Sequence, residues 1–294
     1  MRLNNIILQI IIYKYEIVFM IKHNKIKIVI LVLSSNQIIS LINRLFQKLT
    51  WAKETMGVVT IFYLGGHQKT ELTKKTLKLP SSKKFEDIGK KTIDCFEWVE
   101  RNLDYDVILR TSASSYVDIN QLINFLEKNY EENLYSGVVA EANYQNKSIK
   151  FASGSGYLLS KKNVKLIIQN KDRWNHKLID DVALADFLSY FQIYPKNFER
   201  NTINVFPKFN EIDYKLFLTR CILRDFNLPR VIEGFYMIKL KNNYKKYKED
   251  KKNNFILENF LFYIVRFIQK IYPRKYFSKF QNRHYKKYLK DLEG

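Results

Sequence analysis

KIKIVILVLSS, residues 25–35, is a nearly continuous run of apolar, mostly β-branched side chains that ends in two small polar residues. Such a run is typical of a strand that is buried on both faces of a parallel sheet. In sheets of this kind, ligands bind beyond the carboxyl ends of the strands. We therefore expect residues 27–35 to form the first strand, with Ser34 at a ligand-binding rim.

Outward from this strand, strand-like and helix-like patterns alternate along the chain. Some stretches repeat apolar residues at helical spacing, and short continuous apolar runs lie between them. This alternation predicts an α/β fold with a mostly parallel central sheet. The expected helices cover residues 38–45, 88–103 and 119–126, and the expected strands begin at residues 58, 107 and 135.

Length and composition indicate one large domain with a tail. The chain has 294 residues, of which 46% are hydrophobic, so it can bury one substantial core. From about residue 240 a lysine-rich stretch typical of a solvated linker precedes a segment that is apolar nearly all round. We expect an N-terminal extension at 1–19, a main domain at 20–235 and a basic, aromatic, helical tail at 236–294.

The formal net charge of +21 ordinarily indicates an anionic partner such as nucleic acid, anionic lipid or a phosphorylated substrate. A compositional bias competes with this interpretation, because Lys, Asn, Ile, Tyr and Phe are abundant throughout. The basic residues form no zinc-finger or RNA-recognition motif, so we expect no nucleic-acid partner. Cys95 and Cys221 lack the spacing of a disulfide framework or metal site, which favours a reducing compartment.

Three polar motifs interrupt the apolar pattern. RTSASSYV, residues 110–117, follows the third expected strand. FASGSGYLLS, residues 151–160, has the glycines of a turn between a strand and a helix, and Ser160 can cap that helix. DDV, residues 180–182, puts two carboxylates in the first turn of a helix, where the helix dipole favours their ionised form. An ionised carboxylate can serve as a general base.

In order and spacing these motifs resemble the family 31 glycosyltransferases, the β-1,3-galactosyltransferase and Fringe-like group, over roughly residues 26–195. Residues 110–117 are similar to the family's Lys-Thr-Asp-Asp-Asp-Val-Phe-Val, and residues 151–160 to its Tyr-Ala-Ser-Gly-Gly-Gly-Tyr-Val-Leu-Ser. Residues 180–182 are similar to its Glu-Asp-Val. A weaker likeness joins INRLFQKLTW, residues 42–51, to its Arg-rich helix and Thr-Trp pair.

The resemblance implies a GT-A fold, which is Rossmann-like, and inverting transfer of a hexose from a UDP-sugar to a glycan hydroxyl. The hexose would be galactose or an N-acetylhexosamine, and the acceptor a glycan or lipid-linked glycan. By position, Asp181 is the expected general base, with Asp180 beside it. Residues 153–156 (Ser153, Gly154, Ser155 and Gly156) are expected to contact the acceptor or the donor sugar. The alternative is an inactive relative that only binds sugar or nucleotide, and a less favoured one is a basic nucleic-acid-binding protein.

The metal-binding aspartates of the family are replaced by hydroxyls, which are poor ligands for Mn²⁺ or Mg²⁺. A metal cofactor remains possible, but no residue of this chain is expected to ligate one. The diphosphate then needs another cation, and Arg110 at a strand end can make bidentate contacts to phosphate. The full expected set of diphosphate-binding residues is Ser34, Arg44, Arg110, Thr111, Ser112, Ser114 and Lys239.

The C-terminal tail has two interpretations. Its apolar segment, residues 255–272, is either a helix packed on the core or an interfacial helix that meets anionic lipid with its basic residues. The run at residues 6–13 is short for a bilayer span and has no signal-peptide cleavage site. We expect a bacterial protein in the cytoplasm, at the inner face of the membrane, in lipopolysaccharide or capsule synthesis.

Overall fold

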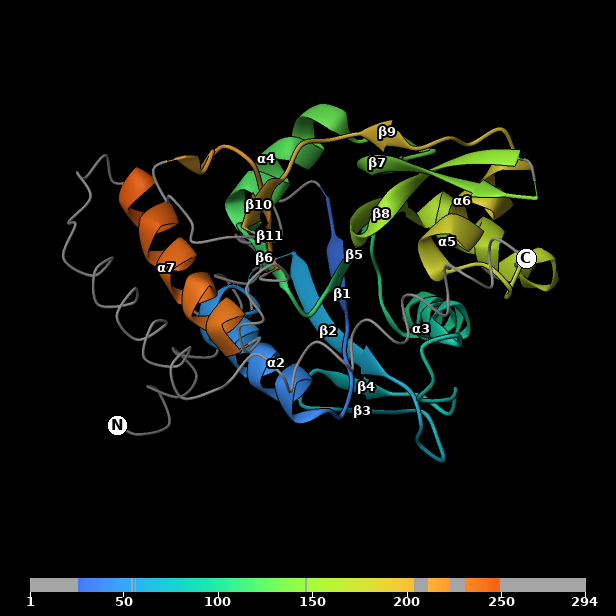
Figure 1. Ribbon diagram of the computed structural model, residues 1–294, viewed down its shortest axis with the longest axis horizontal. Helices are drawn as coiled ribbons and strands as arrows, with labels where there is room; N and C mark the ends of the chain where they lie inside the picture. Colours follow the sequence, from blue (N-terminus) through green and yellow to red (C-terminus); the bar gives the residue numbers. More distant parts are fainter. Residues whose placement is uncertain are drawn as a thin grey trace, which may run out of the picture.

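The computed structural model describes residues 26–53, 55, 57–145, 147–203, 211–222 and 231–248. Its centre is an eight-stranded sheet, accompanied by a three-stranded one (Figure 1). The strands of the large sheet are β1 (Ile28–Leu33), β2 (Val58–Leu64), β3 (Glu71–Thr73), β4 (Thr76–Lys78), β5 (Val107–Ser112), β7 (Tyr135–Tyr144), β8 (Lys147–Ser160) and β9 (Lys196–Asn197). Those of the small sheet are β6 (Ser115–Val117), β10 (Asn201–Ile203) and β11 (Leu218–Cys221).

The large sheet is mixed and largely parallel around its first strand. Its order is β3-β4-β2-β1-β5-β8-β7-β9, and β4, β2, β1 and β5 run parallel. β8 then pairs antiparallel with β5, so that Thr111 lies opposite Gly156. The predicted α/β class is therefore confirmed. The carboxyl ends of β1, β2 and β5 share one rim, where β8 also passes.

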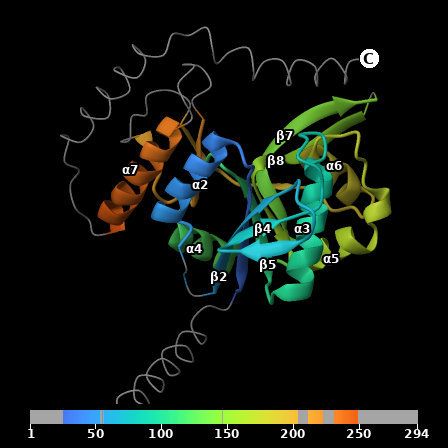
Figure 2. The same ribbon diagram turned by 90° about the horizontal axis from the view of Figure 1, so that it is seen from below.

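Two layers of helices cover the large sheet because its strands are apolar on both faces. Ile28, Ile30 and Val32 belong to one apolar cluster, whereas Val29 and Leu31 belong to the other. This alternation confirms the predicted strand with two buried faces. Figure 2 shows α2 (Ile38–Thr50), α4 (Ile119–Asn129) and α7 (Val231–Lys248) on one side, and α3 (Ile88–Asn102), α5 (Lys161–Gln169) and α6 (Asp180–Ser189) on the other.

The segment at residues 151–156 is a strand, and its prediction as a turn was wrong. It lies inside β8, which continues to the predicted helix cap at Ser160. The Ser160 hydroxyl does accept a hydrogen bond from the Asn163 backbone N–H at 3.3 Å. Neither Gly154 nor Gly156 has a positive φ. The glycines therefore do not make a tight turn, and their role must be sought in what surrounds them.

The boundary expected between residues 235 and 236 falls inside α7. The apolar face of α7 is buried, including Tyr236, Met237, Leu240 and Tyr244. Phe235 packs its ring against Phe46 of α2, with centroids 5.3 Å apart. The helix thus belongs to the main domain up to residue 248. The extension at 1–19 and the predicted membrane segment at 255–272 lie outside the described residues.

No helix in the described part of the chain has the length and apolar character needed to cross a bilayer.

Candidate functional site

The polar end of β5 passes directly from the large sheet into the small one. Arg110, Thr111 and Ser112 are still part of β5, and β6 begins at Ser115 after a two-residue turn. The turn is fixed by α2, since the Gln47 side chain donates to the carbonyl oxygens of Ser112 and Ser115 at 3.1 and 3.0 Å. The end of β5 is therefore a rigid junction between two sheets.

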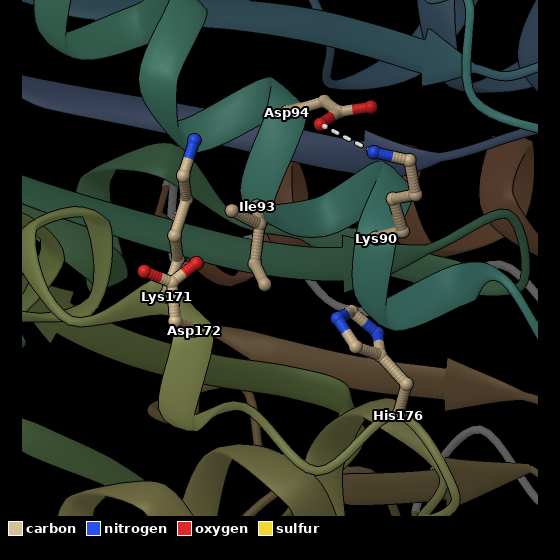
Figure 3. A pocket seen from close by; sticks show the side chains of 6 residues that line it. All are labelled: Lys90, Ile93, Asp94, Lys171, Asp172 and His176. Carbon is tan, nitrogen blue, oxygen red and sulfur yellow. Dashed lines mark ion pairs between the residues drawn. The ribbon is translucent and has the colours of Figure 1, made fainter.

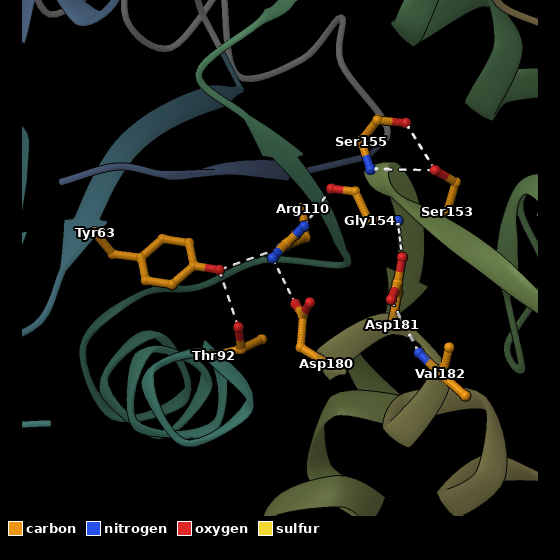
Figure 4. A network of polar contacts seen from close by, with 9 residues as sticks. All are labelled: Tyr63, Thr92, Arg110, Ser153, Gly154, Ser155, Asp180, Asp181 and Val182. Atoms are coloured by element: carbon orange, nitrogen blue, oxygen red, sulfur yellow. Dashed lines mark hydrogen bonds and ion pairs between the residues drawn. The ribbon is translucent and has the colours of Figure 1, made fainter. Parts of the chain in front are cut away.

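Arg110 is buried and fully engaged by protein groups (Figure 4). Its Nη2 donates to the Asp180 carboxylate at 2.5 Å, and its Nε donates to the Tyr63 hydroxyl at 3.2 Å. Its Nη1 donates to the Gly154 carbonyl. The side chains of Arg110 and Asp180 are only 3% and 5% exposed. Each of the three guanidinium nitrogens of Arg110 is thus turned inward and donates to a protein group, and the contact of Arg110 with a diphosphate stays a prediction.

The Arg110–Asp180 pair holds the three motifs together. Because the pair is buried, losing one partner would leave an uncompensated charge in the core, at a cost of about 3–5 kcal/mol. The Tyr63 hydroxyl extends the network to Thr92 at 3.0 Å, and burial raises the pKa of Tyr63 to about 12. Sequence reasoning missed Tyr63 and Thr92, which lie in an apolar strand and on a helix face without any motif.

Asp181 lies beside this network, in the first turn of α6, and is partly exposed. One carboxylate oxygen accepts from the Gly154 backbone N–H at 2.6 Å, and the other accepts from the Val182 N–H at 3.1 Å. Burial and the neighbouring Asp180 charge raise the pKa of Asp181 to about 6. A carboxylate with this pKa is ionised near neutral pH and is also basic enough to take a proton.

Gly154 and Gly156 lie where neighbouring atoms leave no room for a β-carbon. A β-carbon at Gly154 would lie 2.9 Å from Arg110 Nη1 and 3.0 Å from Asp181 Oδ2. A β-carbon at Gly156 would lie 2.4 Å from Leu218 Cδ2 in β11. The missing side chains let the carboxylate approach the backbone of β8 and let the small sheet pack against it.

A cluster of hydroxyls surrounds the junction of β5, β6 and β8. The Ser155 carbonyl accepts from the Thr111 hydroxyl at 2.8 Å and from the Ser115 hydroxyl at 2.9 Å. The Ser112 hydroxyl lies 3.2 Å from the hydroxyls of both Ser114 and Ser115. The predicted residues Thr111, Ser112, Ser114 and Ser155 therefore come together in this structure, and we call them, with Ser115 and Ser153, the serine cluster.

The serine cluster is joined by an arginine that the sequence analysis missed. Arg200, which lies between β9 and β10, donates from Nη1 to the Ser155 hydroxyl and, at 3.5 Å, to the Ser153 hydroxyl. Burial and the charge of nearby Arg220 lower the pKa of Arg200 to about 10. Arg200 belongs to no motif of the sequence, so no local signal pointed to it.

The other three residues that were expected to bind diphosphate, Ser34, Arg44 and Lys239, lie on or beside β1, α2 and α7. Ser34 follows β1, where its N–H donates to the Tyr63 carbonyl at 2.9 Å, and its buried hydroxyl has no partner among the described residues. Arg44 lies on α2 with a buried Nη1, and burial lowers its pKa. Lys239 is buried on α7. No contact with the serine cluster is established for these three residues.

The donor set at the junction does not fit Mn²⁺ or Mg²⁺. These ions prefer carboxylate and carbonyl oxygens. The positions that resemble the metal-binding acids carry Ser112, Ala113 and Ser114, and arginine charges lie nearby. Asp180 is committed to Arg110. Among the residues that the structure describes, no group of three or more His, Cys, Asp and Glu side chains could hold a metal ion.

A separate surface pocket of about 360 Å³ lies between α3 and the segment around the 3₁₀ helix Lys171–Arg173 (Figure 3). An ion pair between Lys90 and Asp94, 3.7 Å long, lies on its α3 side. None of the predicted site residues lines this pocket, so we assign it no part in the site. Its lining residues are Lys90, Ile93, Asp94, Lys171, Asp172 and His176.

Comparison with solved structures finds similar folds among glycosyltransferases. A glycosyltransferase involved in the glycosylation of the major capsid of PBCV-1 matches with 11% identity and a TM-score of 0.45, over 72% of this chain and 98% of that one. The galactosyltransferase LgtC, in complex with donor and acceptor sugar analogs, matches with 10% identity and a TM-score of 0.41, over 73% and 95%.

The glycosyltransferase GlyE of Streptococcus pneumoniae TIGR4 matches with 11% identity and a TM-score of 0.33, over 60% of this chain and 46% of that one. Because all three TM-scores are below 0.5, the likenesses carry no argument about what this chain does. No protein-family model and no curated protein matches the sequence.

Proposed function

We propose that the chain is an inverting glycosyltransferase of the GT-A type, which moves a hexose from a UDP-sugar to a glycan hydroxyl. The observation that carries the proposal is the Asp181 carboxylate, held against the Gly154 backbone with a pKa of about 6. The order of the sequence motifs supports it, since each of the three contributes a residue to one hydrogen-bonded network.

Asp181 acts as the general base in the proposed reaction. It takes the proton of the acceptor hydroxyl as that oxygen attacks the anomeric carbon of the donor sugar. The bond between the anomeric carbon and the β-phosphate oxygen breaks, and UDP leaves with the electron pair. Attack from the face opposite UDP inverts the anomeric centre. The protonated Asp181 then loses its proton to solvent, which its partial exposure permits.

Asp180 and Arg110 position the base and are not expected to touch the reacting atoms. Asp180 is neutralised by Arg110, whereas Asp181 accepts hydrogen bonds from the backbone N–H groups of Gly154 and Val182. This division follows from burial: two adjacent carboxylates cannot both be ionised in a poorly hydrated site unless one is paired. The pairing of Asp180 thus leaves Asp181 as the partly exposed carboxylate with a raised pKa.

The finer assignments are also proposals. The donor is a UDP-hexose, with galactose or an N-acetylhexosamine as the sugar, and the acceptor is a glycan or lipid-linked glycan. We propose that the protein works at the cytoplasmic face of a bacterial membrane in surface-glycan synthesis. Attachment to anionic lipid through the basic tail at 249–294 is part of this proposal and rests on the composition of that tail.

The test is release of UDP from a panel of UDP-hexoses, with and without a glycan acceptor, each in excess Mn²⁺ and in EDTA. The wild-type protein should release UDP from at least one donor, and Asp181→Asn should lose that activity while still binding UDP. Asp172→Asn removes an exposed acid and is the matched control, which should keep the wild-type rate. UDP binding without turnover for every donor would instead support an inactive relative and refute the proposed activity.

A further inference from the structure

Two arginines meet at the serine cluster, and the proton transfer described above uses neither of them. Arg200 reaches the cluster from the loop before β10, and its Nη1 donates to the hydroxyls of Ser155 and Ser153. Its Nε is buried and has no hydrogen-bond partner among the described residues. Within that part of the chain no carboxylate forms an ion pair with it. Arg200 therefore presents a positive charge and a spare donor.

Arg220 approaches the same junction from the small sheet. In the antiparallel pairing of β11 with β6, Arg220 lies directly opposite Ser115. Residues opposite each other in an antiparallel pair project to the same face of the sheet, with β-carbons about 4.5–5.5 Å apart. The Ser115 hydroxyl, in turn, contacts Ser112 and the Ser155 carbonyl. Arg220 is thus anchored beside the hydroxyls at the end of β5.

The two guanidinium groups are close enough for their charges to repel. Burial and the charge of Arg220 together lower the pKa of Arg200 to about 10, so Arg200 stays protonated at neutral pH. Two like charges in a partly buried site repel each other, and an anion bound between them would reduce that repulsion. Arginine is suited to this task because its planar fork can donate two parallel hydrogen bonds to a phosphate.

Hydroxyl donors complete the surroundings. Ser112 and Ser114 occupy the positions that resemble the metal-binding acids, and their hydroxyls lie 3.2 Å apart. A hydroxyl can rotate to donate to a phosphate oxygen, which a carboxylate cannot do. Replacement of acids by serines beside two arginines therefore changes the preferred ligand of this junction from a cation to an anion.

We propose that Arg200 and Arg220, with the hydroxyls of Ser112, Ser114 and Ser153, bind a diphosphate group without a metal ion. The arginines supply the positive charge that a divalent ion supplies in related enzymes, and Arg110 supports the base from within the core. The inference rests on the proposed function only in identifying the diphosphate as that of a UDP-sugar. It replaces the expectation that Arg110 holds this group.

The experiment measures binding of inorganic pyrophosphate and of UDP to the full-length protein in EDTA by isothermal titration calorimetry. Arg200→Gln and Arg220→Gln should each weaken both affinities by about 10- to 100-fold, as expected for loss of a charged hydrogen-bond donor. Arg173→Gln removes an equal charge from an exposed site and should leave both affinities within twofold of the wild type. Arg200→Lys, which keeps the charge but loses the fork, should give an intermediate loss.

Several results would overturn the inference. They are binding that requires Mn²⁺ and vanishes in EDTA, unchanged affinities in both glutamine variants, or an equal loss in the Arg173 control. If the glutamine variants do not fold, Arg200→Lys and the wild-type titration in EDTA still decide the question. Pyrophosphate binding by Arg200 and Arg220 without any UDP-sugar turnover would leave this inference standing and refute the proposed function. Turnover that is insensitive to both arginines would leave the proposed function standing and refute this inference.

Discussion

Replacing Asp181 with Asn should stabilise the protein at neutral and alkaline pH. In the folded protein the pKa of Asp181 is raised from its ordinary value of 3.8 to about 6, first by burial and then by the Asp180 charge. Folding therefore disfavours the ionised form. Below pH 3.8 the carboxyl is protonated in both states and costs nothing. As the pH rises from 3.8 to 6, the unfolded chain ionises first, and stability is lost.

The size of the effect follows from the difference between the two pKa values, which is about two pH units. Each unit corresponds to about 1.4 kcal/mol, so that above pH 6 the ionised Asp181 destabilises the fold by up to about 3 kcal/mol. Asn cannot ionise, and its side-chain oxygen can still accept from the Gly154 N–H. The variant therefore avoids this cost, which corresponds to roughly 6–10 °C in melting temperature for a domain of this size.

The assay is urea unfolding of both proteins between pH 3.5 and pH 8, followed by circular dichroism. The difference in free energy of unfolding should favour the Asn variant by up to about 3 kcal/mol at pH 8 and should disappear towards pH 3.5. Asp172→Asn, at an exposed position, should show no such dependence. A difference that is independent of pH, or a less stable Asn variant at pH 8, would refute a strained carboxylate at this position.

Further changes test the surroundings of the base and the tail. Gly154→Ala should cost about 1–3 kcal/mol in urea unfolding and lower UDP release, because its β-carbon would crowd Arg110 and Asp181. Arg110→Met should cost about 3–5 kcal/mol, since Asp180 loses its buried partner, and adding Asp180→Asn to it should recover part of that loss in the same assay. Truncation after residue 248 should abolish salt-sensitive co-sedimentation with anionic vesicles and leave the melting temperature unchanged. Vesicle binding that survives the truncation would show that the tail is not the membrane-binding segment.

The strands at the centre of the fold could be predicted because their signal is local. β1, β2 and the first three residues of β5 are mostly apolar, and such runs are typical of a covered, largely parallel sheet. The start of α6 at Asp180 was equally readable, because acids are favoured in the first turn of a helix. These features depend on neighbours in the chain, so one sequence is sufficient to find them.

The interior of the site depends on contacts between distant residues, which carry no local signal. Arg110 was expected to face a ligand, but Asp180, 70 positions further along the chain, neutralises it. Glycines in β8 indicated a turn, because glycine is common in turns, whereas here they leave room for Arg110, Asp181 and the small sheet. Arg200 belongs to no motif, and its hydrogen bonds reach Ser153 and Ser155 of β8, which are distant in the sequence.

For α7, by contrast, the sequence did contain a helical pattern of apolar residues. Ile232, Tyr236, Leu240 and Tyr244 recur at helical spacing and are buried. The lysines between them suggested a solvated linker, although lysines on the outer face are compatible with a helix whose other face is packed.

The pH dependence of UDP release by the wild type and by Asp181→Asn tests the central claim most directly. With a donor that the wild type uses, its kcat/KM should rise with an apparent pKa near 6, as Asp181 becomes ionised. The Asn variant should be slower by about 10²- to 10⁴-fold, which is the usual contribution of a general base. A variant that keeps the wild-type rate, or a wild-type rate that does not change between pH 5 and pH 8, would contradict the assignment of Asp181 as the base.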